Sequence, residues 1–275
     1  MSACAAALSG AQNDACWASS APQASTVHDL LHLLGAVTVE GSGAERLVTP
    51  LQRLKAGSTL YLEGTSCDAV YFVRAGTFKS TRMAEDGYEQ VLSFVGRAEL
   101  LGFDALGGAQ HPTTATALED SSVYAIAAHD LVDYGQRVPA LARALYLAVS
   151  QALRASTQMA DVMAAVAAEV RLARFLVQWS QRMADRGESA TRFHLRMSRR
   201  DIASHLGLAH ETVSRGFGLL ASWGYLRVAN RDVEILNLDE IRRFARSTRR
   251  TVEDVVSRRP RSDRSEARFY ALPSA

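Results

Sequence analysis

Short hydrophobic runs rich in Val, Tyr, Phe and Thr alternate with glycines between residues 47 and 127. The clearest runs are STLYLEG (58–64), DAVYFVRAG (68–76), TFKSTRM (77–83), EQVLSFV (89–95) and SSVYAIA (121–127). Short strands spaced about ten residues apart and separated by turn residues are typical of antiparallel barrels and sandwiches. We therefore expect an antiparallel β-barrel here, preceded by a short helix over residues 27–41.

From Ala140 to Arg186 the pattern becomes helical, because this stretch contains neither Gly nor Pro. Apolar residues recur there at alternating steps of four and three, as in a heptad repeat. These residues are Leu141, Leu145, Ala148, Ala152, Ala155, Met159, Val162 and Val166. A helix of some 25 residues is about 38 Å long, more than the barrel alone covers. We expect a coiled coil with a second copy of the chain, and hence a homodimer; the alternative is one helix packed on its own barrel.

A further helix is predicted over residues 167–184, and a pair of short helices follows it. Ser198 is a good N-cap, and Asp201 three residues later completes a capping-box pattern for a helix over residues 199–206. Gly207 suits a sharp left-handed turn, after which a second helix starts near Ala209 or His210 and ends about Ser222. The segment GYLRVANRDVEILN then predicts two strands joined by a turn at residues 230–231. The pattern as a whole indicates a winged helix-turn-helix.

The charges are distributed unevenly along the 275 residues, although the net charge is only +2. Residues 1–167 hold 10 Lys and Arg against 16 Asp and Glu, whereas residues 168–275 hold 21 against 13. An acidic first part and a basic second part favour two domains, of which the second binds a polyanion. A general preference for arginine is the alternative explanation, since Lys55 and Lys79 are the only lysines.

The second helix of a helix-turn-helix enters the major groove of DNA with its N-terminal residues. Here those residues are His210, Glu211, Ser214 and Arg215, and Glu211 and Arg215 are spaced to form an ion pair. Arginine can bond guanine, glutamate can accept a hydrogen bond from cytosine, and serine can contact thymine or a base edge. We expect additional DNA contacts from residues next to this helix and in the wing, namely Ser198, Arg199, Thr212 and Arg227.

The barrel, the long helix and the winged helix together resemble the Crp–Fnr transcription regulators over about residues 45–250. LLGFDALGGAQHPTTATALE and MSRRDIASHLGLAHETVSR are similar to the Fnr branch in particular. The resemblance implies an α+β fold with a jelly roll of the cyclic-nucleotide-binding type. It also implies a homodimer whose Glu211, Ser214 and Arg215 contact TTGAT-like half-sites in an inverted repeat, with RNA polymerase as a further partner. In the cyclic-AMP receptor branch, glycine replaces the serine.

Three positions depart from the family pattern. Ala209 stands where the family has Ser or Thr as the helix N-cap, which costs about 1 kcal/mol. Gly216 and Gly218 lie inside the second helix, where each is about 1 kcal/mol less favourable than alanine. His210 occupies the first position that faces the bases, so the sequence preference of this chain can differ.

Fnr proteins hold a 4Fe–4S cluster through three closely spaced N-terminal cysteines and a fourth in the barrel. This chain has three cysteines in all: Cys4, Cys16 and Cys67. Tyr124 stands where the fourth cluster cysteine would fall. A cluster needs about four thiolates, so we expect none. Cys67 is either a redox switch or an inert small apolar residue.

Cyclic-nucleotide binding in the related branch uses Gly-Glu-Leu followed by Arg-Ser/Thr-Ala, whose arginine binds the phosphate. Glu99 is present here, but His111 and Pro112 stand near the place of the arginine. No lysine or arginine lies between Arg97 and Arg137, so a buried phosphate would lack a charged partner. We therefore expect no cyclic nucleotide.

We predict five segments: a disordered tail (1–26), a β-barrel sensor-like domain (27–137), a dimerisation helix (138–166), a winged helix-turn-helix domain (167–250) and a basic tail (251–275). The few cysteines and the lack of a long apolar run favour a cytoplasmic protein that is not bound to a membrane. A DNA-binding regulator is the favoured function. The alternative is a ligand-responsive module that acts mainly through protein contacts. No catalytic motif occurs in a supporting context, so an enzyme is not expected.

Overall fold

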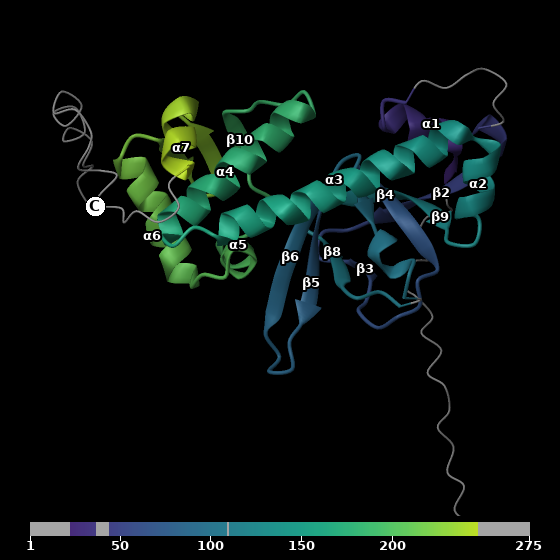
Figure 1. The fold of residues 1–275 in the computed structure, drawn as a ribbon, viewed down its shortest axis with the longest axis horizontal. Coiled ribbons are helices and arrows are strands. Elements are labelled where there is room, and N and C mark those ends of the chain that lie inside the picture. Colours follow the sequence, from purple (N-terminus) through teal and green to yellow (C-terminus); the bar gives the residue numbers. More distant parts are fainter. Residues whose placement is uncertain (1–22, 37–43, 109, 247–275) are drawn as a thin grey trace, which may run out of the picture.

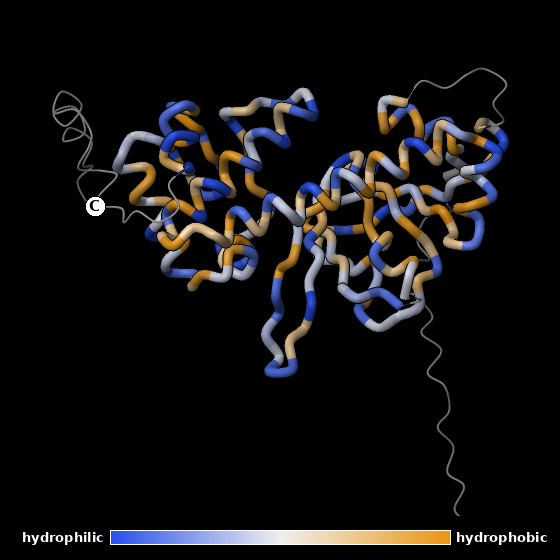
Figure 2. The backbone as a smooth tube through the Cα atoms, in the orientation of Figure 1, coloured by the Kyte–Doolittle hydropathy of each residue, from blue (hydrophilic) through white to orange (hydrophobic). Residues whose placement is uncertain are grey.

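The computed structural model describes residues 23–36, 44–108 and 110–246. They form two lobes bridged by one long helix, α3 (Pro139–Met163), which runs across the molecule (Figure 1). Hydrophobic segments are present in both lobes (Figure 2), and each lobe has its own core. Within the described ranges, no helix has the length and apolar character needed to cross a bilayer.

The N-terminal lobe is built from two antiparallel sheets with the strand orders β1-β2-β9-β4-β7 and β3-β8-β5-β6. The strands are β1 (Gln23–Thr26), β2 (Val48–Leu54), β3 (Thr59–Tyr61), β4 (Ala69–Ala75), β5 (Thr77–Met83), β6 (Glu89–Gly96), β7 (Leu100–Leu101), β8 (Thr114–Ala117) and β9 (Ser121–Ala127). Buried residues from both sheets, such as Val73, Phe78 and Val123, share one core. The sheets form a barrel-like roll without closing into a ring, which confirms the predicted jelly-roll type of fold.

Four helical segments accompany these sheets. They are α1 (Val27–Leu33), η1 (Ala44–Arg46), η2 (Phe103–Ala105) and α2 (Leu131–Arg137). Helix α1 and the first half of α3 pack on the five-stranded sheet, where Leu30, Phe72 and Leu141 are fully buried.

Two predictions near the N-terminus need correction. The helix expected over residues 27–41 ends at Leu33, because Gly35 takes a positive φ of 66°; residues 37–43 lie outside the description. Residues 23–26, assigned to a disordered tail, form β1 and pair with β2. The sequence QAST carries no hydrophobic pattern, so this strand depends on backbone pairing. Thr26 then caps α1 through a capping box with Asp29.

The C-terminal lobe is a winged helix-turn-helix. Its elements are α4 (Ala168–Asp185), β10 (Arg192–His194), α5 (Arg199–Leu206), α6 (His210–Ser222), β11 (Leu226–Ala229), β12 (Asp232–Ile235) and α7 (Leu238–Ala245). The bounds of α5 and α6 confirm the sequence prediction, and Asn230 forms the expected turn between β11 and β12 with φ of 56°. Strand β10, which pairs with β12, and helix α7 were not predicted.

Helix α3 turns much of the predicted heptad face toward its own chain. Leu141 and Ala148 are buried against the N-terminal lobe, and Val162 is buried in the core of the C-terminal lobe. These three residues therefore leave little surface for a second copy, and their part in a dimer interface stays a prediction. Of the other predicted residues, Leu145, Ala152 and Met159 are half-buried, while Ala155 and Val166 are exposed.

A second stripe with the same spacing lies on the outer side of α3. Its members are all exposed: Tyr146, Val149, Leu153, Ser156, Ala160 and Met163. Tyr146 is 77% exposed and Leu153 is 69% exposed, which is unusual for large apolar side chains. We call this set the outer stripe.

Candidate nucleic-acid interface

Local sequence features fix the start of α5 and its angle to α6. The Ser198 hydroxyl accepts the Asp201 N–H at 3.1 Å, and the Asp201 carboxylate accepts the Ser198 N–H at 2.9 Å. This capping box satisfies N–H groups that a helix start otherwise leaves unpaired. Gly207 ends α5 in the left-handed conformation, with φ of 61°. Ala209 precedes α6 and, as expected, makes no side-chain cap hydrogen bond.

Helix α6 buries one face and exposes the other. Val213, Phe217 and Leu220 lie in the core, whereas the predicted base-reading residues are exposed on the outer face: His210, Glu211, Ser214 and Arg215. Thr212 is half-buried at the side of this face. The structure thus presents these four side chains to solvent on one surface of one helix.

The expected ion pair between Glu211 and Arg215 is not formed, and neither side chain has an ion-pair partner in the described chain. An exposed pair four residues apart on a helix stabilises it by only about 0.2–0.5 kcal/mol, which is too little to hold two long side chains together. Both charged groups are therefore available to an external partner.

Gly216 has a packing role that the sequence did not reveal. A Cβ atom at this position would lie 3.0 Å from the Cδ2 atom of Leu172 in α4, so the glycine allows α6 to approach α4 closely. A Cβ at Gly218 would meet no atom within 4 Å, and nothing in the structure explains that glycine.

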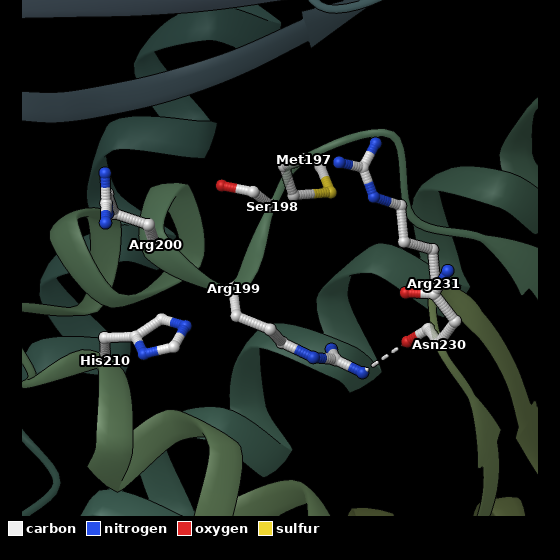
Figure 3. A pocket seen from close by; sticks show the side chains of 7 residues that line it. All are labelled: Met197, Ser198, Arg199, Arg200, His210, Asn230 and Arg231. Atoms are coloured by element: carbon white, nitrogen blue, oxygen red, sulfur yellow. Dashed lines mark hydrogen bonds between the residues drawn. The ribbon is translucent and has the colours of Figure 1, made fainter.

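An open pocket of about 390 Å³ lies beside the exposed face of α6 (Figure 3). Its lining residues come from the start of α5, the start of α6 and the β11–β12 turn: Met197, Ser198, Arg199, Arg200, His210, Asn230 and Arg231. Three arginines and a histidine make the pocket suitable for an anion such as a phosphate. Sequence reasoning missed Arg200 and Arg231, although each adjoins a predicted site residue or turn.

Arg199 is held inside the chain rather than extended into solvent. Its guanidinium lies 3.4 Å above the ring of Phe217 and donates a hydrogen bond of 2.8 Å to the backbone oxygen of Asn230 (Figure 3). Burial, together with the nearby charge of Arg231, lowers the pKa of Arg199 to about 10, so it remains charged at neutral pH. Arg199 thereby joins α5, α6 and the wing.

Arg227 lies in the wing as predicted, but it already has a partner. Its guanidinium is 2.6 Å from the Glu234 carboxylate, which Arg192 also contacts at 2.6 Å. The hydrogen bond from Arg192 and the charges of both arginines lower the pKa of Glu234. The Arg227 side chain remains 71% exposed, so it can reach a phosphate only by sharing or leaving this pair.

Two parts of the chain match known domain families. Residues 51–137 match the cyclic nucleotide-binding domain, and residues 170–244 match the Crp-like helix-turn-helix domain. The chain is also 35% identical over 205 residues to the fumarate and nitrate reduction regulatory protein of Escherichia coli strain K12. That alignment covers 74% of this chain and 82% of the relative. This chain belongs to the Crp–Fnr family of transcription regulators.

Two solved structures have the same fold. FixK2 from Bradyrhizobium japonicum superposes with a TM-score of 0.66 at 27% identity, covering 74% of this chain and all of that one. A CooA mutant from Carboxydothermus hydrogenoformans gives 0.62 at 20% identity, covering 78% and 95%, and shows the fold alone. Membership of the family, shown by the domain match and the 35% identical relative, makes the chain a DNA-binding transcription regulator rather than an enzyme, as the sequence predicted.

The Glu99 carboxylate, which sequence comparison suggested as a cyclic-nucleotide ligand, is engaged within the chain. It lies 2.5 Å from Arg182 and 2.8 Å from Arg186 at the end of α4, and it accepts the Gly96 N–H at 2.8 Å. Burial alone would raise its pKa, but the two guanidiniums lower it overall. Glu99 is therefore an inter-lobe ion-pair residue in this structure.

His111 cannot replace the arginine that binds a cyclic phosphate in the related branch. Its side chain is 2% exposed and stacks on Tyr61 with ring centroids 3.9 Å apart. Burial lowers the pKa of His111, so the imidazole is neutral at neutral pH. The described residues around it do not provide the positive charge that a buried phosphate requires.

The described cysteine does not provide an iron–sulfur site. Cys67 lies in the loop before β4, where burial and the charges of Asp104 and Asp68 raise the pKa of its thiol. Tyr124 is buried in β9, and Cys4 and Cys16 lie outside the described residues. No three potential metal ligands gather in the described ranges, and the full chain has fewer than four cysteines. The residues present do not fit a 4Fe–4S cluster within one chain.

Proposed function

We propose that this regulator is a homodimer that binds an inverted repeat of TTGAT-like half-sites through α6. The observation that carries the proposal is the outer face of α6, where Glu211, Ser214 and Arg215 are exposed beside a basic pocket. Arg215 can bond guanine O6 and N7 together, Glu211 can accept from a cytosine amino group, and Ser214 can contact thymine. Ser214 favours the Fnr type of half-site over the type read by the cyclic-AMP receptor branch.

The basic pocket supplies contacts of a different kind. Arg200 and Arg231, together with the N-terminus of α5 at Ser198, would bind the phosphate backbone next to the half-site. Arg199 would set the distance between α6 and the wing through its bonds to both. Such contacts fix the position of the protein on the duplex, whereas the contacts from α6 select the sequence.

The outer stripe supports the homodimer. Four of its residues are large and apolar, namely Tyr146, Val149, Leu153 and Met163, and all four are at least 39% exposed. Their alternating steps of three and four match a two-stranded coiled coil. A two-fold axis along α3 would relate two chains, each of which contributes one α6 helix. The two half-sites of an inverted repeat in DNA are related by the same symmetry.

We also propose that DNA binding needs neither a 4Fe–4S cluster nor a cyclic nucleotide. The cysteine count, the buried neutral His111 and the ion-paired Glu99 support this proposal. Membership of the family further suggests RNA polymerase as a partner and the cytoplasm as the location.

The test is binding of purified wild-type and Arg215→Ala protein to the inverted repeat and to a repeat with the half-site guanine replaced. Arg215→Ala should lose about 1–3 kcal/mol on the matched site and much less on the substituted site. Ser214→Gly should shift preference from TTGAT-like toward TGTGA-like half-sites. Arg242→Ala, which removes a charge from α7 and from neither α6 nor the basic pocket, is the control and should keep the wild-type preference.

Equal weakening on both sites would show that Arg215 does not read a base. The same titrations at several salt concentrations test the interaction with the phosphates, because the affinity for DNA must fall as salt rises. Binding without salt dependence would instead favour the alternative function through protein contacts. Addition of iron with sulfide, or of cyclic AMP, should leave the affinity unchanged.

A further inference from the structure

The DNA-binding lobe covers the outer edge of the sensor-like lobe. Strand β6 is the last strand of the four-stranded sheet, and α5 lies along it (Figure 1). The Ser204 hydroxyl of α5 accepts the N–H of Val91 at 2.9 Å and donates to the backbone oxygen of Glu89 at 2.9 Å. An edge strand leaves such groups unpaired, and here one serine side chain satisfies both.

Charged and polar side chains extend this contact. Gln90 donates from Nε2 to the backbone oxygen of Ser204 at 2.5 Å. Lys79 of β5 lies 2.5 Å from Glu89 and 3.2 Å from Asp201, and the side chains of Lys79 and Asp201 are both less than one-fifth exposed. Because Asp201 also caps α5, the sensor-like lobe holds the first turn of the helix that begins the DNA-binding unit.

Aromatic packing and further ion pairs surround these hydrogen bonds. Phe94 of β6 packs against Phe175 and Trp179 of α4, with ring centroids 6.3 Å and 6.4 Å apart. The pairs of Glu99 with α4 lie at one side, and Arg196 lies 3.1 Å from Glu119 of the N-terminal lobe. The two lobes are thus joined over α4 and α5, in addition to the covalent link after α3.

We propose that the β6–α5 contact, made by Lys79, Glu89, Gln90, Val91, Asp201 and Ser204, positions α6 for DNA before any DNA or small ligand is bound. Docking leaves His210, Glu211, Ser214 and Arg215 of α6 exposed and the basic pocket open to solvent. A lobe held only by the short link between α3 and α4 would sample many orientations, and DNA binding would have to restrict them. Ser204 and Lys79 are therefore positioning residues for DNA recognition.

This inference rests on the proposed half-site. Its test uses two variants that weaken the contact by different means, Ser204→Ala and Lys79→Met. Ser204 is buried, so alanine removes the hydroxyl without adding volume. The controls are Ser222→Ala at the end of α6 and Lys55→Met, which removes the only other lysine from an exposed pair with Asp120.

Two measurements are made on the full chain. The first is hydrogen exchange at the Val91 amide. The second is the affinity for DNA at several salt concentrations, with the inverted repeat and an unrelated duplex compared. Ser204→Ala should speed exchange at Val91 and weaken binding to the repeat about tenfold, the effect of losing roughly 1.4 kcal/mol of docking. Lys79→Met should weaken repeat binding similarly, and Lys79→Arg should retain wild-type affinity. Affinity for unrelated DNA, the salt slope and both controls should stay at the wild-type level.

Faster exchange at Val91 with wild-type affinity for the repeat would overturn the positioning role. Tighter binding would also overturn it, since the contact would then restrain the DNA-binding lobe instead of preparing it. Unchanged exchange in Ser204→Ala would show that this serine does not hold the edge of β6. A wild-type protein that does not distinguish the repeat from unrelated DNA contradicts the proposed half-site itself, which is a separate result.

Discussion

His205 of α5 lies within the aromatic cluster between the lobes. Its ring centroid is 5.0 Å from that of Phe94 and 5.9 Å from that of Phe175, and its Nδ1 atom is 3.4 Å from the Val91 backbone oxygen. Burial is the main cause that lowers its pKa, from 6.5 to about 4, and the charge of Arg182 adds to the effect. The folded protein therefore keeps this imidazole neutral over a pH range in which the unfolded chain takes up a proton.

The sign and size of the effect follow from these two pKa values. Because the folded-state pKa is depressed, the stability that His205 contributes is fully present above about pH 6.5 and is lost as pH falls toward 4. Each unit of pKa shift corresponds to about 1.36 kcal/mol, so the full loss is roughly 3 kcal/mol. Between pH 7.5 and pH 5, the unfolding free energy should fall by about 2 kcal/mol through this residue alone.

Urea unfolding followed by tryptophan fluorescence measures this change, because Trp179 lies in the same cluster, 6.1 Å from Phe175. The difference in unfolding free energy between wild type and His205→Gln should shrink by about 2 kcal/mol from pH 7.5 to pH 5. His129→Gln, which removes a histidine that is 81% exposed, controls for the loss of a histidine as such. If wild type and His205→Gln show parallel pH dependences, the burial argument is refuted.

Leu153→Glu should give monomers in sedimentation and lose binding to the inverted repeat. Gln151→Glu, which changes an exposed residue on another face of α3, should stay dimeric. A dimeric Leu153→Glu protein would exclude the outer stripe as the interface. Ser198→Ala should lower the unfolding free energy in urea by about 1 kcal/mol through the lost cap, and an unchanged value would contradict this role. Gly218→Ala should raise it by about 1 kcal/mol. Gly216→Ala should not raise the unfolding free energy, because its Cβ would lie 3.0 Å from a leucine of α4. Equal changes in unfolding free energy for the two variants would contradict this reasoning.

The helix-turn-helix could be located from sequence because its boundaries depend on neighbouring residues. Ser198 and Asp201 cap each other three positions apart, Gly207 permits the left-handed turn, and Asn230 turns the wing. These are local backbone requirements that particular side chains satisfy, so they can be recognised in a short window. The strong strands were found for a similar reason, since β-branched and aromatic residues mark them.

Strands with few large apolar residues were missed. β8 has the sequence TATA, and β2 contains Pro50 and Arg53; both form because neighbouring strands pair with their backbones. Strand β1 depends on β2 in the same way. Pairing between segments distant in sequence leaves little trace in the composition of either one.

The side of α3 that remains free was decided by tertiary packing. Two stripes on this helix, one through Leu141 and Ala148 and the other through Tyr146 and Leu153, have the same heptad spacing. Periodicity shows that a helix has an apolar face, but it does not say which other surface covers that face. Here the chain's own lobes bury Leu141, Ala148 and Val162 of the first stripe and leave the outer stripe exposed.

The roles of several charged residues were decided in the same way. From sequence, Glu99 resembled a ligand residue and Arg199 a DNA contact. In the fold, Glu99 meets two arginines from α4 more than 80 residues later in the chain, and Arg199 stacks on Phe217. A charged side chain acts through the groups that lie within a few ångströms of it. The sequence alone determined which residues carry charge and which helix presents them, and only the folding of distant segments onto one another decided which of those charges remain free for DNA.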